Sequence, residues 1–131
     1  MAGSAMVLTY DNIGGIRKII ADWTSDDTTG AVAGTTVKII GELIKGTTDP
    51  GATAPTTLYD IVLTDAEGVN LLGLSADDLL NRSATVTEEV YFGLTTQASA
   101  FPVVADLVTI SVSNAGNSKL GQLIIYYRHA P

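Results

Sequence analysis

The strongest constraint on the fold is a strict alternation of apolar and polar residues near the C-terminal end. In residues 106–113 (DLVTISVS), the apolar residues Val108, Ile110 and Val112 alternate with threonine and serine. Successive side chains of a β-strand point to opposite faces, so this pattern predicts a strand with one buried and one solvated face. Residues 120–128 (LGQLIIYYR) are rich in β-branched and aromatic residues and predict a second strand. Because an NAGN turn sequence lies between them, we expect the two strands to form a hairpin.

Further strand-like segments recur along the chain, at residues 7–10, 16–24, 37–45, 57–64 and 85–94. In the second of these, Ile19, Ala21 and Trp23 share one face, as a half-buried strand requires. In the fourth, Tyr59, Ile61 and Leu63 share one face in the same way. Glycine, proline and small polar residues separate the segments and predict loops over residues 25–36 and 46–56.

One short helix is expected at residues 75–81, where Ser75 can cap the first turn. With no long amphipathic helical pattern, we predict an all-β fold. We expect a single β-sandwich or jelly-roll-like domain of about seven or eight strands with at most one short helix. An N-terminal segment, residues 1–9, is able to extend as an arm, and residues 10–131 form the β-sandwich domain.

Composition limits the partners. The net charge of −7, with no cluster of lysine or arginine, disfavours binding to nucleic acid. No window approaches the roughly 20 apolar residues of a membrane span, so a membrane is not an expected partner. The absence of cysteine excludes disulfides and thiolate chemistry.

The candidates for chemistry are few, and each has a simpler structural explanation. His129 is the single histidine and lies beside the end of the sequence, where a general base would lack neighbours to hold it. One histidine without cysteine makes a zinc site nearly impossible. The carboxylate pairs are best explained as solvated surface charge, and they are Asp26-Asp27, Asp77-Asp78 and Glu88-Glu89.

A turn explains Asp65 and Glu67 better than a calcium loop, because the ligand spacing of an EF-hand is missing. Weak cation binding by Asp60, Asp65 and Glu67 stays open. We therefore predict no catalytic, cofactor-binding or metal-binding residues, no cofactor, and no enzymatic activity.

The adjacent tyrosines Tyr126 and Tyr127 bear on which faces of the last predicted strand are covered. Adjacent strand residues face opposite ways, so if Tyr127 lies in the core, Tyr126 lies on the outside. The continuous apolar run 123–127 predicts that both faces of this strand are covered. In a small sandwich, that suggests a subunit interface.

Turn-and-strand motifs over about residues 10–128 resemble a family of small virion proteins encoded with the head genes of tailed bacteriophages. The residues that carry the resemblance are Gly41-Glu42-Leu43, Thr48-Asp49-Pro50-Gly51, Ala54-Pro55-Thr56, Tyr59-Asp60, Thr64-Asp65, Gly68, Ser113-Asn114-Ala115-Gly116-Asn117, Gly121 and Ile125-Tyr126-Tyr127-Arg128. Such proteins are similar to capsid decoration (cement) proteins, which bind the outer head shell, often as trimers. The family has no catalytic residues to carry over.

The resemblance implies a non-enzymatic decoration protein on the outer capsid surface of a virion, made in the cytoplasm of the bacterial host. Its partners would be the major capsid protein of a tailed phage and further copies of the chain, as a homotrimer. We expect the shell contacts in residues 25–36, in residues 46–56, or in the N-terminal segment, which is the preferred anchor.

The alternative is a carbohydrate- or receptor-binding β-sandwich module of a head fibre, neck or tail. Exposed aromatic residues in one groove would favour it, and Trp23, Tyr59 and Tyr91 are the candidates. A small hydrolase ranks third, because it would need a pocket with convergent carboxylates.

Overall fold

The computed structural model describes residues 4–11, 15–56, 59–68, 88–91 and 103–129, with backbone only at 88–91, 103–106 and 129. This part of the chain is all β, without a helix, which confirms the predicted class. Its seven strands are β1 (Ala5–Asp11), β2 (Ile16–Thr24), β3 (Val32–Pro50), β4 (Asp60–Thr64), β5 (Glu88–Tyr91), β6 (Val103–Ser113) and β7 (Leu120–His129). The short helix expected at residues 75–81 lies outside the described residues.

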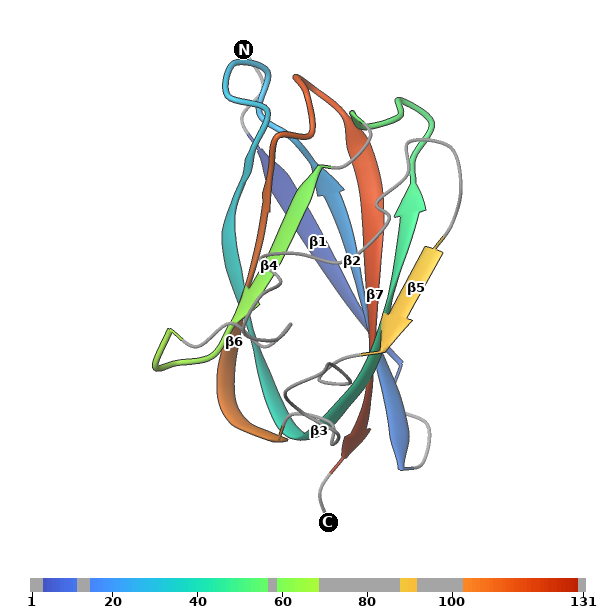
Figure 1. Ribbon diagram of the computed structural model, residues 1–131, viewed down its shortest axis with the longest axis vertical. Helices are drawn as coiled ribbons and strands as arrows, with labels where there is room; N and C mark the ends of the chain where they lie inside the picture. The colour runs from blue at the N-terminus through green and yellow to red at the C-terminus, as the bar shows by residue number, and fades with distance from the viewer. Residues whose placement is uncertain (1–3, 12–14, 57–58, 69–87, 92–102, 130–131) are drawn as a thin grey trace.

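The seven strands form one antiparallel sheet in the order β1-β2-β7-β3-β6-β4, and β5 pairs with β3. The long strand β3 joins two layers. Its first part pairs with β6, and its second part pairs with β7 and β5. Figure 1 shows β3 descending on one side, crossing at the base and rising on the other side. The described strands thus form a single sheet that is folded over on itself into two layers.

The bend of β3 has a local cause. Gly41 has a φ of 147°, a value that residues with a Cβ rarely adopt. The pairing of β3 with β7 then shifts register between Leu43 and Lys45, as a β-bulge does. Bulges bend the strand that carries them and increase its twist. Because of Gly41 and the bulge, the single strand β3 bends and pairs with strands of both layers.

The prediction that β6 and β7 form a hairpin is wrong. Both strands form, but β6 pairs with β3 and β4, whereas β7 pairs with β2 and β3. Gly41 and Glu42 pair with β6 and with β7 at once, so the two strands lie on opposite edges of β3. The connection between them crosses from one layer to the other. It uses positive φ angles at Asn114, Gly116 and Ser118. Apolar alternation predicts which face is buried, but it does not identify the neighbouring strand.

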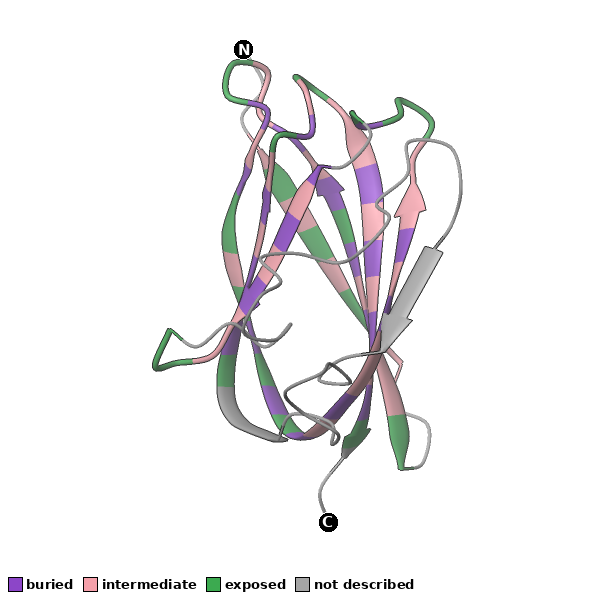
Figure 2. Cartoon of the chain, viewed as in Figure 1, coloured by how far each residue is buried: buried purple, intermediate pink, exposed green. Residues whose placement is uncertain are grey.

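The core lies between the two layers and is built by alternation along every long strand (Figure 2). The inward faces predicted for β2, β4 and β6 are confirmed. The fully or almost fully buried residues of these faces, including Tyr59 directly before β4, are Ile19, Ala21, Trp23, Tyr59, Ile61, Leu63, Val108, Ile110 and Val112. The Trp23 and Tyr59 rings, one from each layer, pack with centroids 5.4 Å apart. Tyr127 is also buried, and Tyr126 lies on the outside as expected.

Three boundaries differ from the sequence-based expectation. The segment 46–56 is irregular only from Gly51 onward, because residues 46–50 continue β3 with β7 on one edge. The first loop is limited to residues 25–31, since β3 begins at Val32. Within the N-terminal segment 1–9, residues 5–9 belong to β1 and pair with β2 along their length.

Candidate functional site

The carboxylate of Asp26 holds a turn together. Its Oδ1 accepts hydrogen bonds from the backbone N–H groups of Thr28 (2.7 Å) and Thr29 (3.0 Å). These two N–H groups, that of Thr29 first, lower the pKa of Asp26 below 3.8, because they stabilise the charged form. The neighbouring Asp27 accepts a hydrogen bond from the Thr28 hydroxyl at 3.1 Å. The pair Asp26-Asp27 therefore stabilises the loop between β2 and β3.

The region considered for weak cation binding is also a hydrogen-bonded turn. Asp65 Oδ1 accepts from the N–H of Glu67 at 3.0 Å, and Gly68 N donates to the Asp65 carbonyl at 3.0 Å. The Asp60 carboxylate accepts from the side-chain amide of Asn114. Among the described residues, no group of three or more histidine or acidic side chains is placed to hold a metal ion.

Of the remaining candidates, the structure describes the backbone of Glu88, Glu89 and His129. Glu88 and Glu89 belong to β5, where they pair with Thr48 and Thr47. His129 ends β7 opposite Gly41. Asp77-Asp78 lie outside the described residues.

Two of the three aromatic residues considered for sugar binding are inaccessible. Trp23 is 1% exposed and Tyr59 is 0% exposed, because both fill the space between the layers. Neither ring can stack on a ligand at the surface. Tyr91 is described by its backbone alone, in β5.

Three loops gather at the end of the molecule where the N-terminus lies, at the top of Figure 1. We call residues 25–31, 51–56 and 114–119 the loop end. Backbone hydrogen bonds tie the loops together: Ala115 N donates to the Gly30 carbonyl at 3.0 Å, and Thr56 N donates to the Ala115 carbonyl at 2.8 Å. Ser4, preceding β1, reaches the same end, where its hydroxyl accepts from Ala33 N at 3.0 Å.

Ser25 is the polar centre of the loop end and was not identified from the sequence. It is 1% exposed. Its N–H donates to the Lys119 carbonyl at 2.8 Å, and its hydroxyl accepts from Lys119 N, also at 2.8 Å. The same hydroxyl donates to the Gly116 carbonyl. Buried serines of this kind fix loops to one another, and only the long-range contact with residues 116–119 reveals the role.

Above this buried polar centre, the loop end presents small side chains to solvent. The exposed residues are Thr28, Thr29, Ala52, Thr53, Ala54, Thr56, Asn114, Asn117 and Ser118. Fixed backbone and short side chains lose little conformational entropy on docking. The loop end is therefore suited to contact another protein.

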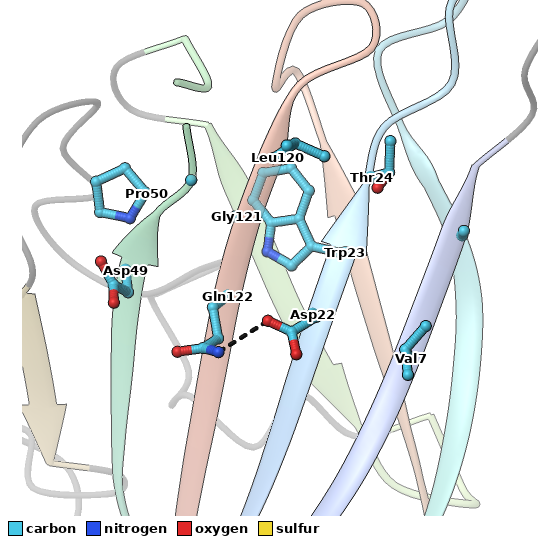
Figure 3. A pocket seen from close by; sticks show the side chains of 11 residues that line it. Val7, Asp22, Trp23, Thr24, Asp49, Pro50, Leu120, Gly121 and Gln122 are labelled. Atoms are coloured by element: carbon cyan, nitrogen blue, oxygen red, sulfur yellow. Dashed lines mark hydrogen bonds between the residues drawn. The ribbon is translucent and has the colours of Figure 1, made fainter. Parts of the chain in front are cut away.

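A second surface is the outer face of β1, β2, β7 and β3. At its upper part, a shallow pocket of about 360 Å³ is lined by residues of all four strands and of the adjoining loop (Figure 3). Asp22, Gln122 and Asp49 form one row across the strands, and the Gln122 amide donates to Asp22 at 2.8 Å. The pocket is open, and its lining is a mixture of polar and apolar groups. Trp23 is the aromatic residue among the lining residues, and its ring is buried beneath the surface.

The lower part of this outer face is basic. Lys18, Tyr126 and Lys45 form another row across the strands. The Lys45 and Lys18 ammonium groups lie 4.8 Å and 5.9 Å from the centroid of the Tyr126 ring, as in cation–π pairs. Lys18 also lies 3.9 Å from the Asp11 carboxylate.

Comparisons with protein-family models, curated proteins and solved structures give no significant match. Within the described part of the chain, no helix is long and apolar enough to cross a membrane.

Proposed function

We propose that the chain is a non-enzymatic virion structural protein that binds the outside of a tailed-phage head shell and stabilises it. Docking would use the loop end. The observation that carries the proposal is the fixation of three separate loops, by backbone hydrogen bonds and by the buried Ser25, into one surface of small exposed side chains. The resemblance of the turn-and-strand motifs to phage decoration proteins supplies the partner, the major capsid protein.

The loop end favours residues 25–31 and 51–56 as the shell contacts over a detached N-terminal arm. Residues 5–9 are engaged with β2, so they contribute to the sheet. Ser4, which directly precedes β1, also lies at the loop end. The resemblance also implies trimers. In our proposal these form on the shell, where bound copies are held at high local concentration.

The test is co-sedimentation of the protein with expanded, empty head shells from the phage that carries the gene. We expect saturable binding by the unmodified protein. Ala54→Arg and Asn117→Arg each place a long charged side chain on an exposed position of the loop end. Each should weaken binding at least about tenfold, which corresponds to about 1.4 kcal/mol.

Thr36→Arg is the matched control, because Thr36 is exposed on β3, within the layer formed with β6. This variant should bind like the unmodified protein. Failure of the unmodified protein to bind shells, or binding only at a neck or tail, would refute the decoration role. Equal weakening by all three arginine substitutions would refute docking through the loop end.

A further inference from the structure

We propose that the outer face of β1, β2, β7 and β3 is a self-complementary surface that pairs two copies of the chain face to face about a two-fold axis. This inference does not depend on shell binding. It rests on the order of charged and apolar rows along the strands, which the register of the sheet determines.

Three successive outward rows define the pattern. The acidic row contains Asp22, Gln122 and Asp49, and the basic row contains Lys18, Tyr126 and Lys45. On β1 the acidic row ends in Val7 and the basic row ends in Asp11, whose carboxylate lies 3.9 Å from Lys18. Between them lies a central row formed by Thr9, Ile20, Ile124 and Thr47. The central row is thus two residues from each charged row on every strand that crosses the face.

A two-fold axis along the central row, in the plane between two copies, reverses the strand direction. It places the acidic row of each copy opposite the basic row of the other. Asp22 then faces Lys18 of the second copy, and Asp49 faces Lys45. Ile20 and Ile124 meet their own counterparts. The acidic side chains of each copy then face the lysines of the other, and Asp11 faces Val7. The face is thus complementary to itself, as an isologous interface must be.

An axis parallel to the strands gives the opposite result. It would place acidic row over acidic row and basic row over basic row, which like-charge repulsion disfavours. The charge pattern therefore selects the antiparallel arrangement.

The area is sufficient for a reversible dimer. Four strands about 4.8 Å apart, followed along the whole of β2, which has nine residues and therefore eight spacings of about 3.3 Å, give a face of about 500 Å². Two such faces bury about 1,000 Å², the lower limit for a specific protein–protein interface. Ile20 on β2 and Ile124 on β7 are partly exposed in the middle of this face, so their side chains are accessible for apolar contact with a second copy. The dimer should be sensitive to concentration and to salt.

Sedimentation velocity over micromolar to submillimolar concentrations tests the proposal. We expect a monomer–dimer equilibrium that weakens with added salt. Asp22→Lys and Lys18→Asp should each raise the dissociation constant at least tenfold. The double variant restores the opposite charges between the copies in exchanged positions and should dimerise more tightly than either single variant. Its recovery should be incomplete, because Lys18→Asp also replaces the ion pair with Asp11 in each copy by a like-charge contact. Lys38→Asp, at an exposed position of β3 in the layer shared with β6, is the control and should have no effect.

A second measurement exploits the lack of cysteine in the chain. Thr9→Cys lies on the central row and should be cross-linked to its counterpart by a short bis-maleimide, whereas Thr36→Cys should not. A monomer at all concentrations, a trimer in solution, or a dimer insensitive to the charge reversals would overturn the proposal. So would a double variant that stays dissociated, or equal cross-linking of the two cysteine variants. Loss of shell binding by loop-end variants would leave the dimer unaffected, so the two proposals fail separately.

Discussion

At the scale of single residues, the Trp23 ring lies across the backbone of Gly121 on the adjacent strand. A Cβ on Gly121 would come within 2.2 Å of Trp23 Cζ2 and 2.6 Å of Cε2. The indole is buried against Tyr59 and has little room to move, so Gly121→Ala should destabilise the protein by about 1–3 kcal/mol, the usual cost of overpacking. Urea denaturation measures the change. Gly15→Ala is the control, because nothing lies within 4 Å of that added Cβ, and its effect should be small. Equal stability of the two variants would contradict this packing.

Ionisation of Asp26 should affect the free energy of unfolding of the protein. Its pKa in the folded protein is below 3.8, because the N–H groups of Thr29 and Thr28 bind the carboxylate. A lowered folded pKa adds stability above the unfolded value, and that contribution is lost as the pH falls through the folded pKa. Titration of the carboxyl carbon by NMR should give a midpoint below 3.8. A midpoint at or above this value would show that the turn does not stabilise the charged form.

The sequence predicted a solvated pair at Asp26-Asp27. It could not reveal the hydrogen-bonded turn, because the donors to Asp26 are backbone groups.

At the scale of elements, β3 determines the architecture by bending between the layers. Because Gly41 has a φ of 147°, Gly41→Ala should cost about 1 kcal/mol or more of stability. Ile40→Thr, one residue earlier on the same strand, is the control. Ile40 is 40% exposed, and threonine suits a strand equally well. A loss in the glycine variant no larger than in the control would indicate that the bend does not need glycine. The measurement is again chemical denaturation.

The same element explains what the sequence could and could not predict. Alternation identified the inward residues of β2, β4 and β6 because burial depends on one strand's own pattern. It failed for the β6–β7 pairing, because β3 offers two edges and neither is marked in the sequence. The glycine, threonines and proline of residues 46–50 predict a loop, but these residues continue β3 and pair with β7. Pairing with a neighbouring strand outweighs weak local propensity here.

At the scale of the whole molecule, the two candidate surfaces arise from contacts between segments far apart in the chain. Ser25 meets residues 116–119, and the acidic and basic rows exist only after β1, β2, β7 and β3 align. The sequence predicted the loops as contact regions and Tyr126 as an outward residue. It could not show that the loops form one surface or that the charges separate along the strands. From the composition, the net charge of −7 leads us to expect that nucleic acid is not a partner.

We propose that the loop end faces the shell, and a three-dimensional reconstruction of decorated head shells by electron cryomicroscopy would show this orientation. We expect additional density on the outer surface of the shell at the lattice symmetry axes. The sheet should fit this density with residues 25–31, 51–56 and 114–119 against the major capsid protein and the other end of the molecule pointing outward. Density in which the outer face of β1, β2, β7 and β3 contacts the shell, or shells without added density, would contradict it.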